Sequence, residues 1–172
     1  NELDIVYKCF NENMGHVDLV GQWNRSVRLS NEKWIWLFSD DDLADNTCVD
    51  YFLKTLKETK EEFLVYRFNT LLINKKSEII NVSPQHATQE HPMEFALYRL
   101  QGNRHGCISN IIFSRKSFER ENGFINFPLA WYADDASIVA FSGDKEIYTI
   151  PGPRVKYRVS WGDNISSQKN NV

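Results

Sequence analysis

WIWLFSDDD, residues 34–42, joins five apolar residues to three consecutive aspartates through a single serine. A run of five apolar residues predicts a strand that is buried on both faces. The aspartates predict that this strand ends in an acidic turn. Strand and turn together are the strongest indication of the fold, and the turn is the strongest indication of function.

Strands and helices alternate on both sides of this stretch. The alternation favours an α/β fold, with a mixed, mostly parallel, Rossmann-like sheet flanked by helices. In such sheets ligands bind at the carboxyl ends of the strands, which is where the aspartates fall. The sequence pattern predicts strands at 5–10, 34–38, 63–73, 79–80, 107–113 and 147–150, and helices at 18–29, 45–56, 93–100, 115–121 and 134–141.

Two details of this pattern are specific. Val49, Phe52, Leu53 and Leu56 form one apolar stripe on the helix expected to begin at Asp45. The segment 151–153, Pro-Gly-Pro, is expected to end the last strand, because proline cannot donate a ladder hydrogen bond.

Length, charge and cysteine content exclude several classes of protein. The 172 residues carry a formal net charge of -3, and Lys and Arg are scattered, so no nucleic-acid partner is expected. Three widely spaced cysteines indicate neither a disulfide framework nor a zinc site, and they favour a reducing, cytoplasmic location. No apolar run reaches the roughly 18 residues of a membrane span, although peripheral association of a longer protein with the inner face of a membrane stays open. One domain is expected over 1–165, followed by a disordered tail at 166–172.

Asp40, Asp41 and Asp42 have two interpretations. Aspartates after a buried strand often form only a solvated turn that caps the next helix. Adjacent carboxylates also repel one another unless a cation offsets their charge, and Mg²⁺ or Mn²⁺ prefers carboxylate oxygens completed by water and phosphate. The sequence alone leaves both interpretations standing.

A second acidic pair, Asp134 and Asp135, opens a predicted helix directly after Trp131 and Tyr132. Paired acids at a helix N-terminus complement its dipole and are common for that reason alone. The two flat rings beside them are of the kind that stacks on a sugar, next to a carboxylate able to take a proton. These four residues are therefore candidates for stacking on a sugar or other ring and for proton transfer.

Taken in order, these motifs resemble the nucleotide-sugar glycosyltransferases of family 2, which have the GT-A fold. The resemblance covers about residues 5 to 160. It rests on the NxG loop of Asn13 and Gly15, on Trp23 and Asn24, on the strand 34–38 with its three aspartates, on Asn122, Gly123 and Phe124, and on Asp134 and Asp135.

The resemblance implies a metal-dependent, inverting transfer of a sugar from a nucleotide-sugar donor to a glycan or lipid-linked acceptor. Asp41 and Asp42 would bind Mn²⁺ or Mg²⁺, with Asp40 and Asp42 as the alternative pair. Asp135 would be the catalytic base, with Asp134 where the family often has Glu. The remaining implied contacts are those of Asp40, Asn13 and Gly15 with the nucleotide sugar, and those of Trp131 and Tyr132 with the acceptor.

The chain also departs from the family pattern. Ser39 stands at the first acidic position, and no counterpart of the family's nucleotide-binding front precedes Asn13, so a fragment truncated at its N-terminus is expected. Arg154, Arg158, Ser160 and Trp161 fall where relatives carry a loop over the diphosphate. The alternatives are a noncatalytic carbohydrate or protein interaction domain, an inactive truncated chain, and a metal-dependent phosphohydrolase. The last lacks the histidines that such two-metal sites often add.

Overall fold

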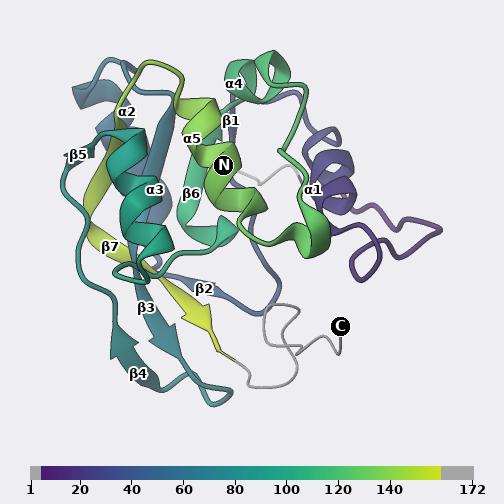
Figure 1. Ribbon diagram of the computed structural model, residues 1–172, viewed down its shortest axis with the longest axis horizontal. Helices are drawn as coiled ribbons and strands as arrows, with labels where there is room; N and C mark the ends of the chain where they lie inside the picture. The colour runs from purple at the N-terminus through teal and green to yellow at the C-terminus, as the bar shows by residue number, and fades with distance from the viewer. Residues whose placement is uncertain (1–4, 160–172) are drawn as a thin grey trace.

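The computed structural model describes residues 5–159, which form one curled sheet with helices on both faces (Figure 1). Within these residues the sheet has seven strands, in the order β1-β6-β3-β7-β2, with β4 paired to β3 and β5 paired to β7. The strands are β1 (Trp34–Ile35), β2 (Leu43–Ala44), β3 (Val65–Ile73), β4 (Ile79–Val82), β5 (Gln89–Glu90), β6 (Ile111–Ser114) and β7 (Ile147–Arg158). The helices are α1 (Leu19–Val27), α2 (Cys48–Glu58), α3 (Pro92–Leu100), α4 (Arg115–Arg120) and α5 (Ala133–Ser142), with short 3₁₀ turns η1 (Ile108–Asn110) and η2 (Pro128–Ala130).

The sheet corrects the predicted fold class. Among residues 5–159 only β3 and β7 pair in parallel, whereas β1–β6, β3–β6, β3–β4, β2–β7 and β5–β7 are all antiparallel. The Rossmann-like, mostly parallel sheet expected for a GT-A-like fold is therefore wrong. Strands buried on both faces have the same continuous apolar sequence in either direction, and alternation with helices does not reveal which strands become neighbours.

The last strand also differs from its prediction, because β7 continues through 151–153 instead of ending there. The register with β3 changes at this point: Phe68 pairs with Ile150, but the next residue, Asn69, pairs with Arg154. The extra residues form a bulge in which neither proline has to donate to the ladder, and Gly152 takes a φ of 101°. The extended β7 reaches Arg158, beside the acidic turn.

At the N-terminal end of the described chain, the strand predicted over 5–10 is absent. Ile5, Val6 and Tyr7 are instead 76–86% exposed. The strand predicted over 34–38 is hydrogen-bonded only at Trp34 and Ile35. The other predicted helices and strands are present, and their bounds differ from the predicted ones by at most four residues, apart from the C-terminal end of β7. On α2 the buried residues are Cys48, Phe52, Thr55 and Leu56, so Val49 and Leu53 do not belong to the buried stripe.

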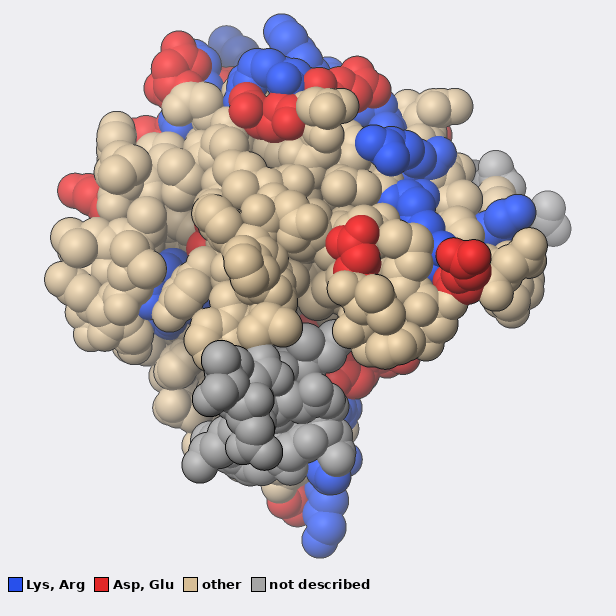
Figure 2. Space-filling view, turned by 45° about the vertical axis from the view of Figure 1, so that its right-hand side comes forward, with Lys and Arg blue, Asp and Glu red and all other residues tan. Residues whose placement is uncertain are grey.

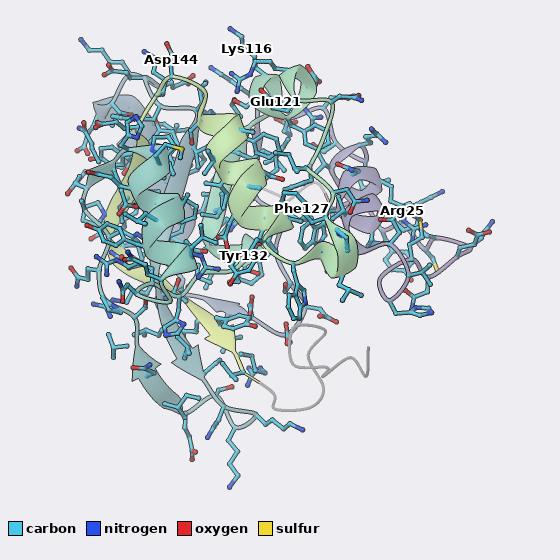
Figure 3. The ribbon with its side chains drawn as sticks, viewed as in Figure 1. Arg25, Lys116, Glu121, Phe127, Tyr132 and Asp144 are labelled. Carbon is cyan, nitrogen blue, oxygen red and sulfur yellow. The ribbon has the colours of Figure 1, made fainter. Side chains whose placement is uncertain are left out.

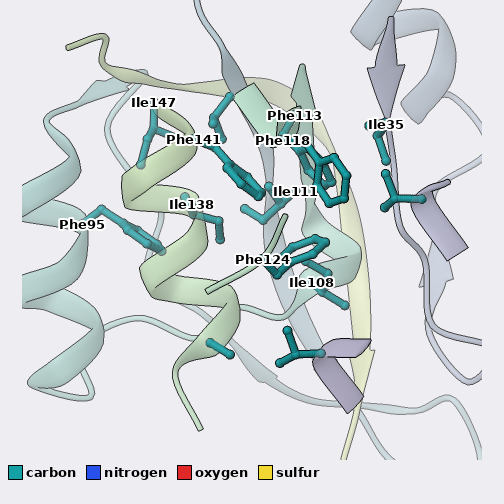
Figure 4. Close-up of a cluster of buried hydrophobic side chains, with 14 residues drawn as sticks. Ile35, Phe95, Ile108, Ile111, Phe113, Phe118, Phe124, Ile138, Phe141 and Ile147 are labelled. Atoms are coloured by element: carbon teal, nitrogen blue, oxygen red, sulfur yellow. The ribbon is translucent and has the colours of Figure 1, made fainter. Parts of the chain in front are cut away.

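Alternate residues of the central strands supply two cores. On one face α3, α4 and α5 cover a cluster centred on Phe113, whose ring lies 5.0 Å from that of Phe141 and 5.4 Å from that of Phe124 (Figure 4). On the other face α2 covers a second cluster that contains Tyr66 and Ile112. The central strands β3 and β6 are thus buried on both sides, whereas β2 and β4 are exposed.

No helix among residues 5–159 is long and apolar enough to cross a membrane. The tail predicted at 166–172, together with Ser160 and Trp161, lies outside the described residues.

Candidate functional site

A cleft of about 880 Å³ lies between the acidic turn and the start of α5. Its wall is assembled from segments that are far apart in the chain. The residues that line it include Trp23 of α1, Phe38 to Asp41 of the acidic turn, Arg99 of α3, Cys107, Leu129 to Tyr132 of the η2 loop, Asp134 and Asp135 of α5, and Tyr157 of β7. The cleft therefore brings the first acidic cluster together with the second acidic pair and its two aromatic neighbours.

The acidic turn is held in place from both of its ends. Before the aspartates, Trp36 donates its indole N–H to the carbonyl of Ser109 at 2.6 Å, and the Ser39 amide donates to the Ser109 hydroxyl at 3.0 Å. After them, Arg158 donates from Nε to the carbonyl of Asp41 at 2.7 Å. These contacts fix the backbone and leave the side chains of Asp40 and Asp41 exposed on the cleft wall.

Asp42 has a different environment from its two neighbours, because it is only 5% exposed and does not line the cleft. Its Oδ1 accepts the amide N–H of Arg158 at 2.9 Å, and its Oδ2 lies 3.6 Å from the Cys107 thiol. Burial raises the pKa of Asp42 above its ordinary value, although these hydrogen bonds oppose the shift. The structure thus places Asp42 as an anchor that ties the acidic turn to β7.

Asp134 and Asp135 occupy the first turn of α5 at the opposite wall. Asp135 is 7% exposed, and its Oδ1 accepts a hydrogen bond from Arg99 Nε at 2.7 Å. Asp134 Oδ1 accepts the amide N–H of Asp135 at 3.0 Å. Burial and the neighbouring Asp135 carboxylate raise the pKa of Asp134 to about 6, although the charge of Arg99 opposes them. A carboxyl group with a pKa this close to neutrality suits proton transfer at physiological pH.

The aromatic residues lie on the loop that leads into α5. Trp131 is 54% and Tyr132 49% exposed, and Tyr132 directly precedes the helix (Figure 3). Leu129, Ala130 and Tyr132 have φ values of 55–60°, which are unfavourable for residues that carry a Cβ. A short loop with three such residues is held in a strained conformation that presents its rings to the cleft.

The base of this loop is fixed by two motif residues that are distant in sequence. The Phe124 amide donates to Asn24 Oδ1 at 2.9 Å. Gly123 has a φ of 107°, and a Cβ added to it would lie 2.6 Å from that same oxygen. Glycine is therefore required here by the conformation and by the close approach of α1.

Asn13 and Gly15, which were predicted to contact the nucleotide sugar, lie outside this cleft. Asn13 Oδ1 accepts the Gly15 amide at 3.0 Å, and Gly15 lines a neighbouring cleft of about 580 Å³. That second cleft shares Trp131 with the first. Neither Asn13 nor Gly15 lines the cleft that holds the acidic groups.

The cleft residues that were not predicted as site residues include Arg99, Cys107 and Tyr157. Nothing in the local sequence separates Arg99 from an ordinary basic residue in the last turn of a helix.

On the face drawn in Figure 2, Lys and Arg lie mainly along the upper and right margins, and the centre is largely uncharged. Arg154 and Arg158 do not line the cleft either, and Arg158 instead bonds to the backbone of Asp41 and of the β3–β4 turn.

No family model and no curated protein matches this chain. Within the described residues, no group of three or more His, Cys, Asp or Glu side chains is arranged to hold a metal ion. What the chain presents is a pair of exposed carboxylates facing a buried acid–arginine cluster across one cleft.

Proposed function

We propose that this cleft belongs to a glycosyltransferase that moves a sugar from a nucleotide sugar to a glycan or lipid-linked acceptor. One observation carries the proposal: Asp41 and Asp135, which are far apart in the chain, line a single cleft together with two exposed aromatic rings. Such a transfer requires a group that neutralises the leaving diphosphate and a base that activates the acceptor hydroxyl. The two walls of the cleft carry side chains suited to these two tasks.

The wall formed by the acidic turn is the donor side of the proposed site. Asp40 and Asp41 are exposed there on a backbone fixed by Ser109 and Arg158. Two carboxylates suit Mn²⁺ or Mg²⁺ when phosphate oxygens and water complete the shell. A cation held there would supply charge neutralisation to the departing nucleoside diphosphate. Asp42, predicted as a metal ligand, is buried in the turn next to Asp40 and Asp41 and holds the turn in place through its hydrogen bonds with Arg158 and Cys107.

The wall formed by α5 is the acceptor side. Asp135 has one oxygen bound to Arg99, and its other oxygen, Oδ2, is buried without a hydrogen-bond partner. A buried unpaired carboxylate oxygen beside a cleft is suited to accept a proton from a sugar hydroxyl. Trp131 and Tyr132 would stack on the acceptor ring.

The free thiols of the three cysteines fit a reducing compartment such as the cytoplasm.

The donor side is tested by Asp41→Ala. Calorimetry on the purified full-length protein should show that UDP or GDP binds only with Mn²⁺ or Mg²⁺, and that Asp41→Ala weakens this binding by at least tenfold, because a carboxylate ligand to the cation is lost. Asp50→Ala, which removes an exposed acid at the start of α2, is the matched control and should bind like the wild type. Equal binding by the wild type in the presence of a chelator would refute the metal role.

A second candidate function is carbohydrate binding without catalysis, favoured by the exposure of Trp131 and Tyr132. The two functions differ in their dependence on Asp135. A binding domain would lose glycan affinity in Trp131→Ala but would release no nucleoside diphosphate from a nucleotide sugar, with or without Asp135.

A further inference from the structure

Arg99 is held by three hydrogen bonds, one to α5 and two to the loop that follows α3. It lies in the last turn of α3, and its Nε donates to Asp135 Oδ1 at 2.7 Å. Its Nη1 donates to the carbonyl of Arg104 at 2.9 Å, and its Nη2 to the carbonyl of Gly106 at 3.4 Å. The guanidinium plane is therefore fixed by two backbone carbonyls before it meets the carboxylate. The side chain is 15% exposed and lines the cleft.

This contact constrains one oxygen of Asp135 and leaves the other without a partner. Oδ1 is bound to Arg99, whereas Oδ2 is buried and accepts no hydrogen bond. Because a carboxylate is planar, fixing one oxygen also fixes the direction in which the other presents its lone pairs. Catalytic bases are commonly oriented in this way by a third group.

The acidic groups around Arg99 keep its guanidinium charged. Asp134 lies next to Asp135 on α5, and its negative charge also raises the pKa of Arg99. Asp40 and Asp41 line the opposite wall. Burial pushes the pKa of Arg99 down, but the hydrogen bond and charge of Asp135 outweigh it and raise the pKa overall. Arg99 thus stays charged and offsets part of the negative charge of the pair.

We infer that Arg99 is a positioning residue that orients Asp135 so that its free oxygen faces the acceptor hydroxyl. The inference rests on the proposed function, since it assigns Asp135 the role of base. Arg99 itself does not touch the reacting atoms. It acts through the carboxylate that it holds.

The competing explanation is that the ion pair only ties α3 to α5. Arg120 offers a matched control for that explanation. Its Nε meets the Glu121 carboxylate at 2.6 Å, and its Nη2 donates to the carbonyls of Ala140 and Phe141 at the far end of α5. Arg120 therefore also ties a neighbouring helix to α5, through backbone carbonyls instead of a carboxylate, and it does not line the cleft.

The test compares Arg99→Gln, Arg99→Lys and Arg120→Gln in the full-length protein. Turnover is followed as UDP or GDP released from a nucleotide sugar that the wild type hydrolyses, with water as the acceptor. Arg99→Gln should lower kcat by about 10- to 100-fold with the donor KM within about twofold, because the base is displaced while the donor wall is intact. Arg120→Gln should leave kcat within about twofold.

A second readout does not depend on turnover. Carbon-13 NMR titration of the aspartate carboxyl groups, assigned with Asp134→Asn and Asp135→Asn, follows the acidic pair directly. Arg99→Gln should raise the pKa of Asp134 by about one unit, because a nearby positive charge is lost. Arg99→Lys should keep this pKa near its wild-type value but restore only part of kcat, since an ammonium lacks the planar fork.

The outcomes separate the inference from the proposed function. An equal loss of kcat in Arg99→Gln and Arg120→Gln would show that Arg99 only ties α3 to α5. That result would overturn the inference and leave the proposed function standing. A shifted pKa with unchanged kcat would do the same. If the wild type releases no nucleoside diphosphate from any UDP- or GDP-sugar, the proposed function fails and takes the inference with it.

Discussion

Asp135→Asn is expected to lower the rate of sugar transfer by about 10²- to 10⁴-fold, the usual contribution of a general base. Asparagine keeps the shape of the side chain, and its carbonyl oxygen can still accept the hydrogen bond that Arg99 donates to Oδ1 at 2.7 Å. What is lost is the ability of the second oxygen to take a proton. Donor binding should therefore stay within about twofold of the wild type, as measured by calorimetry with UDP or GDP and Mn²⁺.

Asp134→Asn is the matched variant for this experiment. It removes the neighbouring carboxylate, whose pKa is raised to about 6, but leaves Asp135 and Arg99 in place. Its kcat should fall less than that of Asp135→Asn. If Asp135→Asn transfers sugar at the wild-type rate while Asp134→Asn does not, the base is Asp134 and the assignment of Asp135 is wrong.

Glu90→Gln is expected to lower the free energy of unfolding by about 3 kcal/mol, because it leaves a buried charge without its counter-ion. The charge belongs to Arg67 of β3, which is 0% exposed and meets Glu90 Oε2 at 2.5 Å. Burial lowers the pKa of Arg67 to about 10, so the side chain remains charged at neutral pH. Arg67 also donates to Thr149 Oγ1 at 3.0 Å, which cannot replace the lost carboxylate.

Urea unfolding followed by circular dichroism measures this effect. Glu58→Gln is the control, since it breaks a pair with Lys54 at 3.7 Å in which both side chains are more than half exposed. Exposed pairs contribute about 0.5 kcal/mol or less, so this variant should unfold almost like the wild type. Equal small losses in the two variants would show that the buried pair adds no more than a surface pair.

The pH dependence of the buried pair follows from Glu90. Burial pushes the pKa of Glu90 up, but its contacts with His86 and Arg67 outweigh burial and lower it overall. A carboxyl group with a lowered pKa stabilises the fold above its unfolded pKa and loses that contribution as the pH falls through its folded pKa. The difference between wild type and Glu90→Gln should therefore shrink below about pH 4.

Most helices and the long strand β3 could be predicted because their signals are local. The serine that caps α4, Ser114, accepts the Ser117 amide at 3.1 Å, and β3 is rich in aromatic and branched residues. The order and direction of the strands could not be predicted, because they depend on contacts between distant segments. β6 lies between β1 and β3 and pairs antiparallel with both, and nothing in the sequences of these strands indicates that arrangement.

The candidate site divides in the same way. Asp40, Asp41, Asp134 and Asp135 could be proposed from residue type and position, and all four line one cleft. The burial of Asp42 could not be anticipated, because it depends on β7 continuing through two prolines to Arg158. The pairing of Arg99 with Asp135 could not be predicted either, because it depends on how α3 and α5 pack against each other.

The most direct measurement is paramagnetic line broadening in a ¹⁵N-labelled sample that contains substoichiometric Mn²⁺, recorded with and without UDP or GDP. The proposed site predicts that broadening appears with the nucleotide, and that it is strongest at the amides of Asp40 and Asp41 and weaker at those of Tyr132, Asp134 and Asp135, which line the same cleft. It should disappear in Asp41→Ala. Broadening centred on a different surface, or equal with and without nucleotide, would contradict the assignment of this cleft as a metal-dependent donor site.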